Sequence, residues 1–104
     1  MNSTDTVSRR PSVEQERMVH ERDSIRSSLV RSRPDLETRI VDGPSGALVI
    51  PLRSGRSIEI GRLPRRGAAR WVVVTPRADG ARVHEPRCLA DYRRIVDTAL
   101  SEAS

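Results

Sequence analysis

Residues 70–83, with the sequence RWVVVTPRADGARV, decide the fold that this chain is expected to adopt. The run from Trp71 to Thr75 contains the only Trp of the chain followed by four β-favouring residues, which is typical of a strand with apolar neighbours on both faces. Asp79-Gly80 is a strong hairpin signal, because both residues tolerate a positive φ in a tight turn. The stretch therefore predicts a β-hairpin whose second strand is formed by residues 81–84.

Upstream of this hairpin the sequence predicts a tail and a helix. Residues 1–11 are polar and rich in Ser and Thr, so we expect a disordered tail there and a single domain over residues 12–104. Ser12 and Gln15 have the spacing of a capping box, and a helix from about residue 13 to residue 31 follows. Its apolar stripe is sparse, so the helix is expected to lie on a sheet edge or to pair with a second copy of itself.

Three further strands are expected between the helix and the hairpin. Every second residue shares one face of a strand, and these residues are Leu36, Thr38 and Ile40 in the first run, Leu48, Ile50 and Leu52 in the second, and Ile58 and Ile60 in the third. Turns containing Gly and Ser separate the three runs. Short connections imply antiparallel pairing. Together with the hairpin, these strands predict a five-stranded antiparallel meander that is twisted or partly closed. A small Sm-like or SH3-like barrel flanked by helices is the alternative architecture.

A second helix is expected after the hairpin. Pro86 suits the first turn of a helix, and the apolar residues beyond it recur at spacings of three and four. This stripe comprises Cys88, Leu89, Tyr92, Ile95, Val96, Ala99 and Leu100. It predicts an amphipathic helix packed on the sheet, with Cys88 as a buried structural cysteine. The order of helix, five strands and helix predicts an α+β fold.

The composition narrows the class of protein. With 104 residues and two aromatic side chains, the core must be aliphatic and thin, so a homodimer is a further expectation. All 19 basic residues are Arg, which excludes chemistry that requires a side-chain amine. A single cysteine cannot form an internal disulfide, and no secretory signal or membrane-spanning run is present in the sequence. We therefore expect a cytoplasmic protein that has no membrane partner.

Positive charge is concentrated around the predicted hairpin. Residues 62–87 hold seven arginines against Asp79 and Glu85, and this local excess equals the net charge of +5 of the whole chain. Guanidinium groups form bidentate contacts with phosphates and carboxylates. We therefore expect the hairpin region to contact the phosphates of DNA or RNA. The candidate binding residues are Arg62, Arg65, Arg66, Arg70, Arg77, Arg82 and Arg87.

Other features of the hairpin region bear on the hypothesis that it contacts DNA or RNA. Trp71 begins the most apolar strand, so we expect it in the core rather than in a base-stacking platform. Over residues 56–101 the order of strands, Asp-Gly turn and helix resembles small DNA-binding modules such as the arm-binding domains of tyrosine integrases, and this resemblance implies DNA as the partner. These elements are common to any hairpin followed by a helix, so no family is assigned. The alternative function is a protein-interaction module, of adaptor, chaperone-like or immunity type, that binds an acidic protein.

No catalytic constellation is visible in the sequence. His84, Glu85 and Cys88 are close together, but a zinc site would need a further ligand and His20 is the only other histidine. Glycine-rich phosphate loops, G-x-S-x-G and H-E-x-x-H are missing from the chain. We therefore expect a binding protein without enzymatic activity, metal or cofactor.

Overall fold

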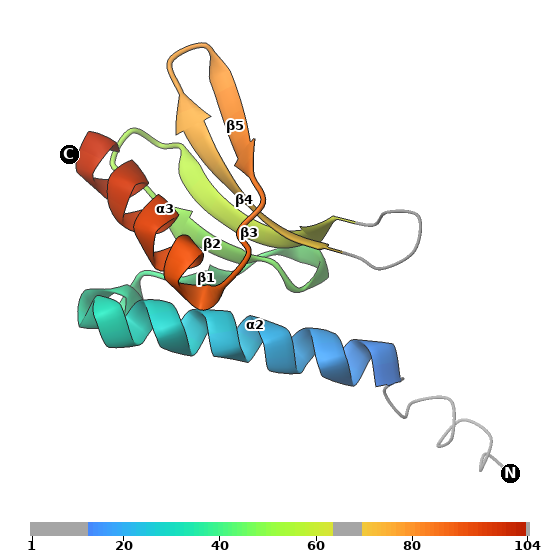
Figure 1. Cartoon of the computed structure of the whole chain (residues 1–104). Helices are drawn as coiled ribbons and strands as arrows, with labels where there is room; N and C mark the ends of the chain where they lie inside the picture. Colours follow the sequence, from blue (N-terminus) through green and yellow to red (C-terminus); the bar gives the residue numbers. More distant parts are fainter. Residues whose placement is uncertain (1–12, 64–69, 104) are drawn as a thin grey trace, which may run out of the picture.

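A computed structural model describes residues 13–63 and 70–103, and shows two α-helices and five β-strands in that part of the chain (Figure 1). The expected tail over residues 1–11 lies outside the described residues, and so do residues 64–69, which include Arg65 and Arg66. The elements in chain order are α2 (Val13–Ser32), β1 (Val41–Asp42), β2 (Leu48–Pro51), β3 (Ser57–Leu63), β4 (Arg70–Arg77), β5 (Gly80–His84) and α3 (Leu89–Ala103).

The five strands form one antiparallel meander in the order β1-β2-β3-β4-β5. This confirms the predicted α+β fold. The sheet is open, with β1 and β5 at opposite edges, so the alternative of a closed Sm-like or SH3-like barrel is wrong. Leu48, Ile60 and Val73 lie opposite one another on β2, β3 and β4, and none of the three has exposed surface. This row marks the face of the sheet that is covered by helices.

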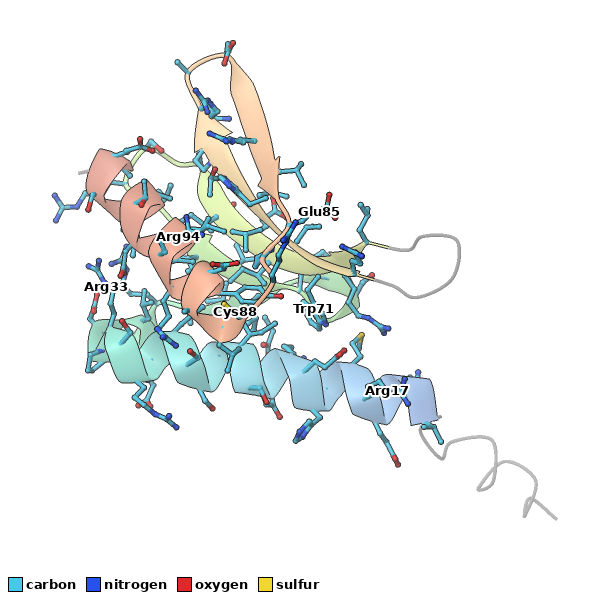
Figure 2. The ribbon with its side chains drawn as sticks, in the orientation of Figure 1. Arg17, Arg33, Trp71, Glu85, Cys88 and Arg94 are labelled. Atoms are coloured by element: carbon cyan, nitrogen blue, oxygen red, sulfur yellow. The ribbon has the colours of Figure 1, made fainter. Side chains whose placement is uncertain are left out.

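Helix α3 lies across that face, and α2 runs beneath α3 and the lower part of the sheet (Figure 1). The two helices and the sheet share one cluster of buried residues, to which α2 contributes Ile25 and Leu29. Helix α3 contributes the stripe that its spacing predicts, from Tyr92 to Leu100, so its packing on the sheet is confirmed. Trp71 (Figure 2) packs against this cluster as expected. Its indole N–H donates to the carboxylate of Glu21 on α2 over 3.0 Å.

The strand predicted over residues 36–40 is wrong. Residues Pro34–Thr38 form a 3-10 helix instead, and β1 begins only at Val41. Leu36 and Ile40 are both buried, but residues four apart share a face of a helical turn as well as a face of a strand. Proline at the start and acidic residues in the first turn favour the helical form here.

Two local details of the hairpin region also differ from the prediction. Arg77 lies opposite Gly80, so the two loop residues are Ala78 and Asp79 rather than Asp79 and Gly80. Gly80, with φ of 148°, takes the backbone conformation that a side chain would disfavour. Helix α3 begins at Leu89, one residue after Cys88, and Cys88 is exposed. The prediction of a buried cysteine is therefore wrong, because the buried stripe starts only at Tyr92.

The packing of α2 against the core gives a stability prediction. Leu29 is 1% exposed, and Leu29→Ala should lower the free energy of unfolding by about 2–5 kcal/mol, because it removes buried methyl groups and leaves a cavity. The matched control is Leu89→Ala on α3, where the side chain is 42% exposed and the change should stay within about 0.5 kcal/mol. Urea denaturation measures both. Equal destabilisation by the two variants would contradict the packing of α2.

Candidate functional site

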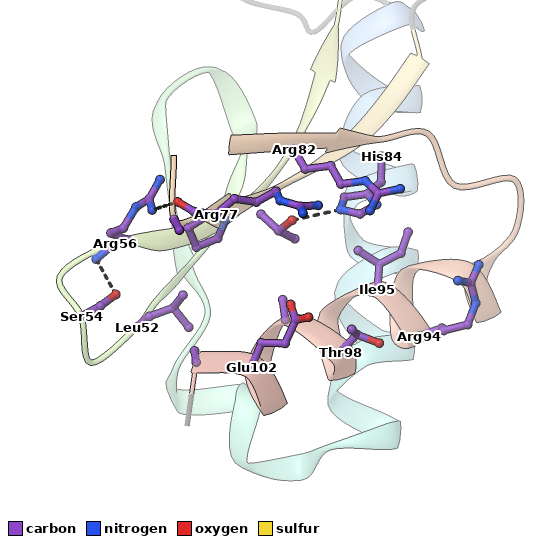
Figure 3. A pocket seen from close by; sticks show the side chains of 15 residues that line it. Leu52, Ser54, Arg56, Arg77, Arg82, His84, Arg94, Ile95, Thr98 and Glu102 are labelled. Carbon is purple, nitrogen blue, oxygen red and sulfur yellow. Dashed lines mark hydrogen bonds between the residues drawn. The ribbon is translucent and has the colours of Figure 1, made fainter. Parts of the chain in front are cut away.

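A cleft of about 650 Å³ lies between the β4–β5 hairpin and the C-terminal half of α3 (Figure 3). Its apolar lining includes Leu52, Pro76, Ile95 and Ala99. Its basic lining consists of Arg56, Arg77, Arg82 and Arg94, together with His84. Glu102 is the one acidic residue that lines it. The cleft therefore combines an apolar surface with a strong excess of positive charge.

The alternation of the hairpin strands explains why these basic side chains face one way. Thr75 and Arg82 are cross-strand partners, and Arg77 and His84 lie two residues further along their own strands, so all four belong to one face of the sheet. That is the face covered by helices, because Val73 on the same face of β4 belongs to the core. The end of the hairpin projects past α3 (Figure 1), and the polar residues of this face line the cleft rather than the core.

Helix α3 supplies the opposite wall. Arg94, Thr98 and Glu102 recur at every fourth position and line the cleft with Ile95 and Ala99. Residues four apart lie on the same side of a helix, so these polar residues form a stripe beside the buried one. The Arg94 guanidinium donates to the Asp91 carboxylate over 3.0 Å, which neutralises part of its charge.

Arg56 connects the β2–β3 turn to the hairpin. Its guanidinium donates to the backbone carbonyls of Arg77 and Gly80, at the two ends of the β4–β5 turn. Within residues 13–63 and 70–103, no carboxylate lies within ion-pair distance of the guanidinium of Arg77 or Arg82. These two exposed groups are therefore available to an anion, while Arg56 holds the hairpin that carries them.

The pKa of His84 responds to its burial and to the positive charges of the cleft. Its Nε2 lies 2.9 Å from the Thr75 hydroxyl oxygen. Partial burial, followed by the positive charges of Arg82, Arg77 and Arg94, lowers the pKa of the imidazole below its usual value of 6.5. The side chain is therefore mostly neutral at pH 7. An anion bound between these arginines would raise this pKa again, because it would stabilise the protonated ring.

The arginines predicted from the sequence do not all meet at this cleft. Arg77 and Arg82 line it, whereas Arg65 and Arg66 lie outside the described residues. Arg62 is half-buried and lies opposite Trp71 on the face towards α2, not at the cleft.

Arg70 and Arg87 line a different, smaller hollow near the start of α3. Trp71, Glu85 and Tyr92 complete much of its wall. The Arg70 guanidinium lies 3.7 Å from the Glu85 carboxylate, and the backbone N–H of Arg87 donates to Asp91 over 2.9 Å. The carboxylate of Glu85 thus offsets the charge of Arg70 in this hollow.

Two cleft residues, Arg56 and Arg94, were not among the residues predicted from the sequence. Arg56 directly precedes β3, and continuing the β3–β4 register places it near Arg77. Arg94 follows from its position beside Ile95 at the border of the apolar stripe of α3. Both signals exist in the sequence, but they identify the cleft only once strand register and helix position are known.

Other kinds of site find little support in the described part of the chain. No group of three or more His, Cys, Asp or Glu side chains could hold a metal ion there. No described helix has the length and apolar character needed to cross a bilayer. No protein-family model matches the chain, and no match was found among curated proteins or solved structures.

The positive charges near His84 give a prediction for its pKa and for the pH dependence of stability. We expect its pKa to lie below 6.5 and to rise in Arg82→Gln, because removal of the guanidinium stabilises the imidazolium. A base with a lowered pKa binds protons more weakly in the folded than in the unfolded state. His84 therefore contributes a loss of stability as the pH falls below about 6.5.

Proton NMR of the imidazole ring measures the pKa of His84. The His20→Gln variant is used to assign the signal, and Arg31→Gln is the control. An equal rise in both arginine variants would contradict the proximity of Arg82.

Proposed function

We infer that the protein is a small basic binding protein whose cleft between the β4–β5 hairpin and α3 receives the side chains of an acidic segment of a protein partner. The observation that supports this function most directly is the pair of guanidiniums of Arg77 and Arg82. They have no carboxylate partner among the described residues, and they lie beside an apolar lining in one cleft. Such a site suits a ligand with both carboxylates and apolar groups.

The apolar lining favours a peptide over a phosphate backbone. Leu52, Ile95 and Ala99 offer a surface that side chains of a peptide can cover, whereas a sugar–phosphate chain has few apolar groups to place there. Bases could supply apolar surface by stacking, but stacking needs exposed aromatic faces. Tyr92 is buried and Trp71 packs against the core, and neither lines this cleft.

Nucleic acid is the second candidate partner. Four arginines line the cleft against one glutamate, and guanidinium groups bind phosphate oxygens as readily as carboxylates. Phosphate contacts of this kind would be independent of sequence and sensitive to salt. The excess of arginine in residues 62–87 supports the same candidate.

Charge reversal in the cleft tests the proposed function. The variant carries Arg77→Glu and Arg82→Glu, and the matched control carries Arg17→Glu and Arg31→Glu. Both control residues are exposed on α2, and Figure 2 shows Arg17 near the N-terminal end of that helix. A library of random short peptides is selected on each protein. Peptides enriched by the wild type and the control should carry an excess of Asp and Glu, and the cleft variant should lose affinity for them by about tenfold or more, or about 1.4 kcal/mol. Enriched peptides without excess acid would refute the proposal.

A salt titration tests the nucleic-acid candidate with the same proteins. If duplex DNA binds at the cleft, reversal of Arg77 and Arg82 should make the slope of log K against log salt less negative by about 0.9 for each phosphate that is no longer neutralised. A third variant reverses Arg65, Arg66 and Arg70, which belong to the set predicted from the sequence and are not among the residues that line the cleft. Weaker DNA binding only in this third variant would place a nucleic-acid surface away from the cleft. Unchanged binding in all variants would exclude these arginines as phosphate ligands.

A further inference from the structure

Strand β5 forms one edge of the sheet and pairs only with β4. The opposite edge, β1, has two residues, so β5 is the longer unpaired edge among the described strands. In an antiparallel pair, every second residue turns its N–H and C=O away from the partner strand. An edge strand such as β5 therefore presents backbone donors and acceptors to an additional strand.

The two faces of β5 differ in chemistry. Arg82 and His84 face the basic cleft. Val83 faces the other side of the sheet, where it is 57% exposed and lies opposite Val74. A strand added beside β5 would therefore have a basic neighbour at one residue and an apolar neighbour at the next.

This arrangement disfavours a second copy of the chain whose β5 pairs with this one at Arg82. Two antiparallel β5 strands related by a two-fold axis through Arg82 would bring the two Arg82 side chains directly opposite each other. Like charges in that position are destabilising, and charged residues on edge strands are a known protection against self-association. An acidic strand is complementary at the same position. The positive charge of β5 therefore favours an acidic strand as its neighbour.

We propose that the outer edge of β5 accepts an extended acidic segment of the partner as a sixth strand of the sheet. Alternate carboxylates of the segment lie beside Arg82 and reach towards Arg77 and Arg94, and the apolar residues between them cover Val83. Backbone hydrogen bonds to β5 provide affinity, and the alternating pattern provides specificity. The inference rests on the proposed function, and adds the geometry by which the segment binds.

The test uses a short synthetic peptide that alternates glutamate with valine, in three forms. One form is unmodified, and the other two carry N-methyl groups on alternate backbone nitrogens, in the two complementary sets. Methylation removes a donor without changing charge, so the set that faces β5 should weaken binding by about tenfold or more. The set that faces away should bind like the unmodified peptide. Hydrogen exchange of the full-length protein should show added protection of amides within β5, at Ala81 or Val83.

The outcomes separate this inference from the proposed function. Strand addition is supported if the unmodified peptide binds the wild type but not the Arg77→Glu, Arg82→Glu variant, and if one of the two methylated peptides does not bind the wild type. Equal binding of both methylated forms, or no added protection in β5, overturns strand addition while the acidic-segment function stands. Equal affinity of the unmodified peptide for the wild type and the cleft variant overturns both. A Val83→Glu variant should bind about tenfold more weakly, and Val41→Glu, exposed on β1 at the opposite edge, serves as its matched control.

Discussion

The structure depends on the burial of one aliphatic face of the meander beneath α3. Leu48, Ile60 and Val73 form a continuous row on that face, and each such side chain contributes about 1.5–3 kcal/mol when it leaves water. Aromatic residues add little to this core, so the fit of aliphatic side chains between sheet and helix must be close. Helix α3 covers the part of the face near this row, and the hairpin extends beyond it (Figure 1). The cleft lies between α3 and the part of the hairpin that extends beyond the helix.

The same face of the hairpin thus changes character along its length. Val73 belongs to the core, Thr75 is buried with its hydroxyl group near His84, and Arg77 is exposed in the cleft. Guanidiniums that face one small volume repel one another, and the lowered pKa of His84 reflects burial together with the positive charge of these groups. Arg56 limits this repulsion by donating to hairpin carbonyls rather than pointing freely into the cleft. An anion is the natural complement of such an arrangement, because it relieves the repulsion that the fold imposes.

The ion pairs elsewhere on the molecule have a smaller role. Arg33, which directly follows α2, lies 3.5 Å from Asp97 on α3, but both side chains are well exposed. Exposed pairs of this kind contribute about 0–1 kcal/mol. The more specific tie between the layers is the bond from Trp71 to Glu21, because a half-buried indole N–H needs a partner. The position of α2 is therefore set mainly by packing at Ile25 and Leu29, with this hydrogen bond as its polar counterpart.

The sequence by itself determined the elements whose signals are local. Periods of two and of three to four residues identified β2, β3, α2 and the buried stripe of α3, because backbone geometry fixes which neighbours share a face. The β-favouring run after Trp71 and the Asp79-Gly80 turn signal identified β4 and β5. The same logic was ambiguous at Leu36 and Ile40, where a helical turn and a strand bury the same residues. It also misplaced Cys88, because it put Pro86 in the first turn of a helix that begins only at Leu89. Only the tertiary structure decided the site. Arg56, Arg82 and Arg94 come from three elements, and strand register together with the placement of α3 brings them to one cleft while it directs Arg70 elsewhere. The excess of positive charge was visible in the sequence, but the direction of each charge depends on contacts between residues far apart in the chain.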